Sequence, residues 1–217
     1  MEPRIVTEVD NIFILIVSIS VFFLLLITVA MIYFVIRYRK KKHPVAENIT
    51  GNTTLEIVWT VIPLILVMLI FYYGWVGFKT MRNVPPDAMT VKVTGKMWLW
   101  SFEYENTKKS DSLLYVPVGR PIKMEINSAD VIHSFYLAAF RIKEDAIPGR
   151  TNYLWFHPLN LGEYDIVCAE YCGMNHSYML GKLIVLPEDK FKEWVSQLPP
   201  PPDTLKADSL KIGVKLD

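Results

Sequence analysis

Twelve consecutive residues of this 217-residue chain read Cys168-Ala169-Glu170-Tyr171-Cys172-Gly173-Met174-Asn175-His176-Ser177-Tyr178-Met179. The run brings two thiols, an imidazole and a thioether close together along the chain. A second histidine, His133, lies upstream at the end of a strand-like stretch, from which it can reach the same point in space. Thiolate and thioether ligands favour copper over hard cations. The run therefore predicts a copper site.

The number of cysteines favours two copper ions over one. A blue-copper site needs one cysteine, two histidines and a weak axial methionine, so this chain has one thiolate too many for it. Cys168 and Cys172 can instead bridge two copper ions. His133 and His176 are expected to bind one ion each. Met179 and a main-chain carbonyl are expected to be weak outer ligands. We expect such a dinuclear copper centre to spread one electron over both metals.

Two other uses of these side chains are open. A structural zinc site also takes two cysteines and two histidines, but the histidines of zinc fingers are usually roughly three to five residues apart. His133 and His176 are 43 residues apart. A Cys168–Cys172 disulfide would close a very small loop, whereas disulfides of small exported domains usually join distant segments. Copper fits the spacing better than either.

Apolar residues, which make up 52% of the chain, are concentrated near its start. Residues 12–36 and 57–78 contain no charged side chain, and about 20 apolar residues suffice to cross a bilayer core of roughly 30 Å. We expect two membrane-spanning helices. The first is longer than the apolar core of a cleaved signal and follows acidic residues, Glu2, Glu8 and Asp10, so we interpret it as a retained helix.

The link between the two spans is basic. It contains Arg37, Arg39, Lys40, Lys41 and Lys42. Basic links stay in the cytoplasm, so both termini and everything after residue 78 should face the periplasm or its equivalent. We expect the inner (plasma) membrane of a bacterium or an equivalent energy-transducing membrane. The net charge of +1 gives no reason to expect a nucleic-acid partner.

Beyond Pro85-Pro86 the pattern changes to short alternating segments broken by Gly, Pro and Asn, which is typical of an antiparallel β domain. The expected strands are 89–93, 98–104, 113–116, 121–127, 131–136, 151–156, 163–167 and 181–186. This number of short strands favours a sandwich or a Greek-key barrel.

A helix should open with Pro187 in its first position and present one apolar face. That face comprises Phe191, Trp194, Val195 and Leu198.

The cysteine run, with the upstream Asp130-Val-Ile-His133-Ser, resembles subunit II of haem-copper cytochrome c oxidase. The resemblance covers all but about the last fifteen residues. It includes Gly95-Lys-Met-Trp98-Leu-Trp100-Ser-Phe-Glu103-Tyr104, the stretch 145–150, and Glu56-Ile-Val-Trp59-Thr-Val-Ile-Pro63. It implies a mainly β protein with a transmembrane α-helical hairpin, residues 1–86. A cupredoxin-like Greek-key β-barrel (87–198) and a Pro-rich spacer with a tail (199–217) should follow.

The resemblance also implies a function. The dinuclear centre, called copper A, would accept single electrons from a c-type cytochrome and pass them to haem in subunit I. Subunit I, with other membrane subunits around it, would reduce oxygen to water with coupled proton translocation. The chain has no Cys-x-x-Cys-His attachment sequence, so haem is expected only in a partner.

Trp98 would receive the incoming electron, because it is the first tryptophan of the family pattern Gly-x-x-Trp-x-Trp. We expect it on one strand with Trp100 and on the same side, an arrangement that ordinary packing also explains. The family docks cytochrome c through surface acids. Four acids are available here, Glu103, Glu105, Asp111 and Asp130. Lys108 and Lys109 interrupt this acidic surface, so the identity of the electron-donor protein stays open.

Three further roles are expected, each with a simpler alternative; the resemblance implies those of Glu170 and Glu56, and the place of Met179 in the ligand loop indicates its own. The Glu170 backbone carbonyl would be a weak copper ligand and its side chain a magnesium ligand shared with subunit I, unless it is a solvated loop residue. Met179 would be an axial ligand that tunes the redox potential, unless it only fills the core. Glu56 would lie at the mouth of a proton pathway, unless it only complements a helix dipole.

Other classes of protein share parts of this pattern. A copper-free quinol oxidase subunit II keeps the hairpin and the β domain as an assembly module, but it would not need the intact ligand set. A copper-delivery or metal-sensing protein usually has an exposed site with few ligands. The electron-transfer domain of nitrous oxide reductase shares the copper run but needs neither two spans nor Glu56.

Overall fold

The computed structural model describes residues 4–45, 48 and 50–197 and divides into two compact units. One unit is Arg4–Met81, and the other comprises the described residues from Arg82 onward. Leu198, the proline run 199–202 and the tail 203–217 lie outside the described residues. The expectations for them therefore stay predictions.

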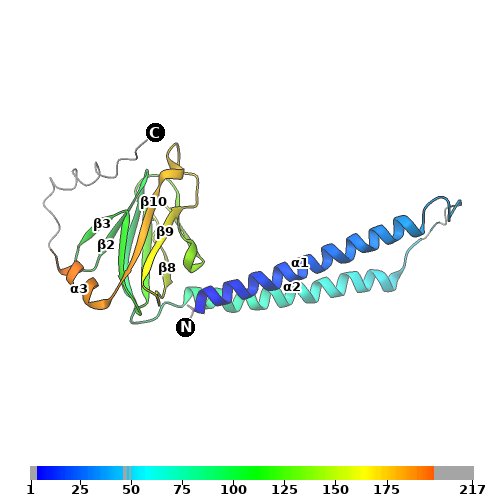
Figure 1. Ribbon diagram of the computed structural model, residues 1–217, viewed down its shortest axis with the longest axis horizontal. Helices are drawn as coiled ribbons and strands as arrows, with labels where there is room; N and C mark the ends of the chain where they lie inside the picture. The colour runs from blue at the N-terminus through cyan, green and yellow to red at the C-terminus, as the bar shows by residue number, and fades with distance from the viewer. Residues whose placement is uncertain (1–3, 46–47, 49, 198–217) are drawn as a thin grey trace. The chain divides into compact units, whose positions relative to one another are not determined.

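The first unit is a hairpin of two long helices, α1 (Arg4–Arg37) and α2 (Thr53–Arg82), which run antiparallel beside each other (Figure 1). Both are long and apolar enough to cross a membrane, and each extends beyond the predicted span. Their apolar side chains point outward all round, as a helix in lipid requires. Asn52 caps α2, because its side-chain oxygen accepts a hydrogen bond of 3.0 Å from the Leu55 amide.

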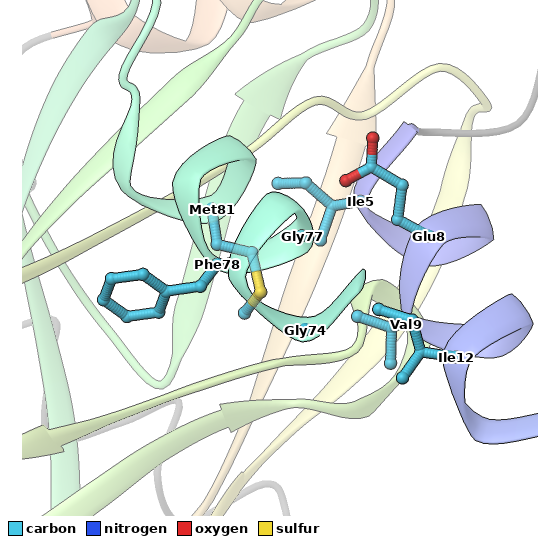
Figure 2. Close-up of a pocket in the computed structure, with 8 residues that line it drawn as sticks. All are labelled: Ile5, Glu8, Val9, Ile12, Gly74, Gly77, Phe78 and Met81. Carbon is cyan, nitrogen blue, oxygen red and sulfur yellow. The ribbon is translucent and has the colours of Figure 1, made fainter. Parts of the chain in front are cut away.

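The two helices approach closely at Gly77. A Cβ atom added there would lie 3.3 Å from Cδ1 of Ile12. Beside this contact is a small cavity of about 110 Å³ (Figure 2), lined by Ile5, Glu8, Val9, Ile12, Gly74, Gly77, Phe78 and Met81. Glycine therefore allows the Ile12 side chain to pack closely against the backbone of α2 at this end of the hairpin.

The second unit is a sandwich of two five-stranded sheets (Figure 1). One sheet has the order β3-β2-β1-β5-β8, with bounds β1 Met89–Lys96, β2 Leu99–Tyr104, β3 Lys109–Asp111, β5 Ile122–Ser128 and β8 Asn152–Phe156. The other has the order β4-β10-β9-β6-β7, with bounds β4 Leu113–Pro117, β6 His133–Leu137, β7 Ile142–Ala146, β9 Gly162–Cys168 and β10 Leu180–Leu186.

The prediction of a purely antiparallel domain is wrong at two places. The pairs β1–β5 and β4–β10 are parallel, and the remaining pairs are antiparallel. Parallel neighbours cannot be joined by a tight hairpin. The chain joins β1 to β5 through β4, which belongs to the opposite sheet, so β5 returns beside β1 in the same direction.

Alternating side chains fill the space between the sheets. In β5 every second residue from Ile122 to Ser128 is buried. The largest fully buried side chains are Trp100, Phe102, Phe135, Phe156, Leu114, Ile122, Met124, Ile126, Leu137, Ile166, Met179 and Leu183. Each large apolar side chain buried in this way contributes about 1.5–3 kcal/mol.

Two strands were not predicted, and both lie at sheet edges. β3 is short and polar, and β7 contains Lys143, Glu144 and Asp145. Edge strands often carry charged side chains, which conceal the alternating pattern. The strand expected at 98–104 begins one residue later, so Trp98 lies in the turn before β2 and the expected shared strand with Trp100 is wrong.

A last helix, α3 (Glu188–Ser196), packs on the sandwich through its apolar face. Pro187 is its N-cap, one position earlier than expected. The Trp194 ring lies 4.3 Å from that of Tyr115 between centroids. Lys108 is buried here, and its Nζ donates to the carbonyls of Trp194 and Gln197 at the end of the helix. Lys108 is therefore a structural cation and does not interrupt a surface patch.

Candidate metal centre

The site begins where two neighbouring strands meet at one end of the sandwich. His133 is the first residue of β6, and Cys168 is the last residue of β9. Phe135 lies directly opposite Cys168 in the antiparallel pair, and residues two apart in a strand face the same side. The His133 ring therefore points to the same face as the Cys168 sulfur, and the distance from Nδ1 to Sγ is 4.0 Å.

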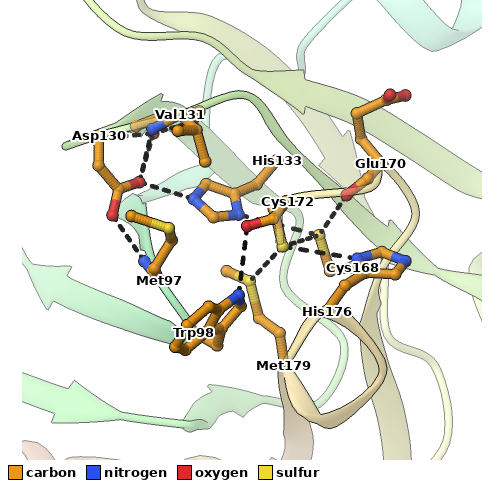
Figure 3. Close-up of polar contacts among 11 residues, drawn as sticks. Met97, Trp98, Asp130, Val131, His133, Cys168, Glu170, Cys172, His176 and Met179 are labelled. Carbon is orange, nitrogen blue, oxygen red and sulfur yellow. Dashed lines mark hydrogen bonds and ion pairs between the residues drawn. The ribbon is translucent and has the colours of Figure 1, made fainter. Parts of the chain in front are cut away.

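The loop between β9 and β10 brings in the other side chains (Figure 3). The two cysteine sulfurs lie 3.8 Å apart, and Sγ of Cys172 lies 3.5 Å from Nδ1 of His176. Met179 immediately precedes β10, and its sulfur lies 3.8 Å from that of Cys172. All five side chains predicted to bind metal thus converge, with each imidazole beside a different sulfur.

The centre is largely shielded from water. His133 and Met179 are fully buried, and both cysteines are buried free thiols. Burial, together with the hydrogen bond and the charge of Cys168, raises the pKa of the Cys172 thiol above its usual range. Thiolates rather than thiols bind metals, so a cation must displace protons from this pair.

Glu170 presents its two ends to different surroundings. Its carbonyl oxygen lies 3.3 Å from Sγ of Cys168. Its carboxylate points away from the sulfur atoms toward the outside (Figure 3), and the residue is exposed. The backbone and the side chain of Glu170 therefore face different surroundings, and the two ligand roles that the resemblance implies for them stay predictions.

Asp130 has a role that the sequence analysis missed. Its carboxylate accepts hydrogen bonds from Nε2 of His133 at 2.8 Å and from the Met97 and Val131 amides at 2.7 Å each. Burial by itself would raise the pKa of this carboxyl, but these hydrogen bonds outweigh it and lower the pKa to about 2. The spacing Asp-x-x-His could have indicated the contact.

Gly95 also supports the site. A Cβ atom at this position would lie 3.0 Å from Cδ2 of His133 and 3.1 Å from the Trp100 ring. The absence of a side chain there leaves room for the histidine. Trp100 itself is fully buried, with its ring against those of His133 and Phe135.

Trp98 lies at the edge of the centre and is partly exposed. Its indole N–H donates to the main-chain carbonyl of Cys172 at 3.2 Å (Figure 3). Its ring also lies against Gly173, where a Cβ atom would be 3.4 Å from Cζ2 of the indole. Trp98 therefore contacts the cysteine loop, whereas Trp100 packs on the His133 ring.

The other residues singled out in the sequence are not among these metal-binding side chains. Glu56 is exposed in the first turn of α2. Among the expected docking acids, Asp130 is engaged as described, Glu103 pairs with Lys109 at 3.3 Å, and Asp111 accepts a hydrogen bond from Ser101. The Glu105 carboxylate accepts a hydrogen bond from the Thr90 amide at 3.2 Å.

The donor set fits copper better than zinc. Two sulfurs of cysteine, two imidazole nitrogens, one thioether and one carbonyl face the same small space. These are more donors than a tetrahedral zinc site takes. Thioether and thiolate together favour copper. The buried group formed by His133, Cys168 and Cys172 is close enough for one ion to contact all three residues.

The fold and the site define a class of protein: a cupredoxin-like β-sandwich with two helices that could span a membrane, and a soft-ligand site at one end of the sandwich. Family comparisons specify the class further. Residues 3–75 match the family described as "Cytochrome C oxidase subunit II, transmembrane domain". Residues 107–186 match "Cytochrome C oxidase subunit II, periplasmic domain". The chain belongs to the cytochrome c oxidase subunit II family, and the predicted family and fold class are confirmed.

Individual relatives carry the same family name. "Cytochrome c oxidase subunit 2" of Alkalihalophilus pseudofirmus is 38% identical over 194 residues, covering 83% of this chain and 56% of the relative. The chain thus spans little more than half of that protein. The Oenothera berteroana protein of the same name is 32% identical over 213 residues, covering 83% of each. The periplasmic domain of cytochrome oxidase subunit II of Bradyrhizobium japonicum is 34% identical, with a TM-score of 0.50. That alignment covers 58% of this chain and 99% of the solved one.

Proposed function

We propose that the chain is the electron-accepting subunit of a respiratory terminal oxidase and holds a dinuclear copper A centre. One observation supports this above the others: two free cysteine sulfurs 3.8 Å apart lie between two imidazole nitrogens, with a thioether beside them. When bound, the copper pair supplies a single-electron carrier. The copper-free quinol oxidase alternative has no use for this buried set of donors.

The chain contributes geometry and shielding. Cys168 and Cys172 would hold the metal through their sulfurs, and His133 and His176 would each bind through Nδ1, which lies beside a different sulfur. Met179 and the Glu170 carbonyl would be the weak ligands. Because most of these groups belong to strand ends or to one short loop, they are held in place before metal binds. Such pre-organisation lowers the cost of ordering the site when metal binds.

Trp98 is the residue through which electrons arrive. Its partly exposed ring can contact a donor protein, and its N–H is hydrogen-bonded to the backbone of the ligand Cys172. From that carbonyl to Sγ the route is covalent. We assign the donor to the c-type cytochromes, and the acceptor to haem in subunit I, where oxygen is reduced to water and protons are translocated.

The other assignments concern the assembled complex. The exposed Glu170 carboxylate is suited to a magnesium ion shared with subunit I, because magnesium binds through one or two carboxylates and keeps waters. Glu56 marks the cytoplasmic mouth of a proton pathway. Residues 87–198 and both termini lie on the periplasmic side, residues 1–86 form the anchor, and residues 199–217 are the spacer and tail.

The test is a metal count with electron paramagnetic resonance on the full chain in its purified membrane complex. We expect two copper ions per chain beyond the metal held by the partner subunits, and the hyperfine pattern of one electron shared equally by two copper nuclei. The Cys172→Ser variant should lose this pattern, whereas Ser177→Ala, in the same loop, should retain it. Zinc alone, the spectrum of a lone copper, or no metal would each contradict the proposal.

A further inference from the structure

Asp130 joins two parts of the site that are far apart in the sequence. It lies in the connection between β5 and β6, yet one of its oxygens binds the Met97 amide in the turn before β2, and the other binds His133 and Val131 (Figure 3). The Asp130 amide also donates to the Ser128 hydroxyl at 3.2 Å. The carboxylate is therefore held from several directions, and its side chain is only 20% exposed.

The contact with His133 determines which ring nitrogen can bind metal. A carboxylate only accepts hydrogen bonds, so Nε2 of His133 must carry the proton that faces Asp130. The other nitrogen, Nδ1, is then a free lone pair on the side of Cys168. Partners of this kind commonly fix the tautomer and the orientation of a metal-binding histidine.

The contact with Met97 acts on the neighbouring residue, Trp98. The turn is held at the Met97 amide by Asp130, and at the indole N–H by the Cys172 carbonyl. If the hydrogen bond between Asp130 and the Met97 amide were lost, Trp98 would be held only by the hydrogen bond of its indole to Cys172 and by its ring contact with Gly173. The position of Trp98 over the Cys172 loop therefore depends in part on Asp130.

We propose that Asp130 is a positioning residue that aligns His133 for metal binding and also holds Trp98 against the Cys172 loop. This inference rests on the proposed function and adds a role for an acid that charge alone would class as a docking residue. A docking acid acts through its charge at the surface. A positioning acid acts through the exact location of its oxygens, so the two roles respond differently to substitution.

The test uses two substitutions of Asp130 in the full chain. Asp130→Asn removes the charge and replaces one acceptor by a donor. Asp130→Glu keeps the charge but displaces the oxygens by one methylene. Asp111→Asn is the matched control, because it removes the same charge from another expected docking acid, whose carboxylate accepts a hydrogen bond from Ser101. The readouts are hydrogen exchange at the Met97 amide in the metal-free chain and copper affinity by titration.

We expect both Asp130 variants to speed exchange at Met97 and to weaken copper binding by about 10–100-fold, the usual effect of losing a partner of a metal-binding histidine. Asp111→Asn should change neither. If Asp130→Glu behaves like the wild type in both measurements, Asp130 acts only through its charge and the inference is wrong. If Asp130→Asn does not fold, the comparison between Asp130→Glu and the wild type decides alone.

The two proposals can fail separately. A wild-type chain that takes up no copper pair contradicts the proposed function, while the exchange measurement still shows whether Asp130 holds the turn. A wild-type chain with the copper pair but unchanged exchange and affinity in both Asp130 variants overturns only the positioning role.

Discussion

The indole N–H of Trp98 donates a hydrogen bond of 3.2 Å to the carbonyl oxygen of Cys172, a residue 74 positions later in the chain. The contact joins the turn before β2 to the cysteine loop, and these segments belong to different sheets of the sandwich. A partly exposed aromatic ring is thereby connected to the backbone of a buried thiol. This relationship underlies the first prediction.

Trp98→Phe should slow reduction of the copper centre by a c-type cytochrome, because phenylalanine keeps the ring contact but loses the N–H. We expect a loss of about tenfold or more, equivalent to about 1.4 kcal/mol in the barrier. Stopped-flow reduction measures it, and the resonance spectrum of copper should stay unchanged. Tyr178→Phe, at an exposed aromatic residue of the cysteine loop, is the control and should keep the normal rate. Equal rates in all three proteins would refute the role of Trp98.

Met179→Leu should separate ligation from core packing, because Met179 is fully buried in the sandwich. Leucine fills a similar volume, so the loss in stability should stay below about 1.5 kcal/mol. Loss of the thioether should nevertheless shift the reduction potential of the centre, which spectroelectrochemistry measures. Met124→Leu makes the same change at another fully buried position in β5 and should leave the potential alone. An unchanged potential in Met179→Leu would mean that this methionine only fills the core.

The predicted ligands could be chosen from the sequence because their chemistry is specific and four of the five lie within one short run. The two spans were predictable for a similar reason, since uncharged stretches of that length have few other uses. The predictions that failed concern residues whose positions depend on contacts between distant segments of the chain. Trp98 lies in a turn that is hydrogen-bonded to Asp130 and Cys172, and alternation along a strand cannot reveal this.

Surface charge was equally hard to interpret from sequence. Lys108 and Lys109 are adjacent and chemically identical, yet one is buried against α3 and the other is exposed beside Glu103. Their different surroundings follow from the turn between β2 and β3, which directs the first side chain at the end of the helix. The edge strands β3 and β7 were missed because their polar residues lack the pattern of a buried strand.

Lys108→Met should therefore destabilise the β domain. Lys108 donates to the carbonyls of Trp194 and Gln197 and lies over the Trp194 ring, 4.2 Å from its centre. Losing these hydrogen bonds from a buried ammonium group should lower the free energy of unfolding by about 1–3 kcal/mol. Lys109→Met removes only an exposed ion pair with Glu103 and should cost at most about 1 kcal/mol. Denaturant unfolding followed by tryptophan fluorescence compares them, and equal losses would contradict the burial argument.

Glu170→Gln should affect magnesium without affecting copper. The substitution leaves the backbone carbonyl near Cys168 in place and changes only the exposed side chain. In the assembled complex we expect weaker binding of manganese, used as a paramagnetic substitute for magnesium, and an unchanged copper spectrum. Glu163→Gln, an exposed acid of β9, is the control and should bind manganese normally. A changed copper spectrum with normal manganese binding would reverse the assignment of the two ends of Glu170.

Glu56→Gln should distinguish the two roles left open for this residue. Glu56 lies in the first turn of α2, where a negative charge near the positive end of the helix is favourable by about 0.3–1 kcal/mol. Asn52 already caps this helix, so the loss of that charge alone should not prevent the chain from assembling. If the residue also leads protons toward subunit I, oxygen turnover of the complex should fall severalfold while copper content and spectrum stay normal. Turnover equal to that of the wild type, with equal assembly, would leave Glu56 as a helix-terminal charge and nothing more.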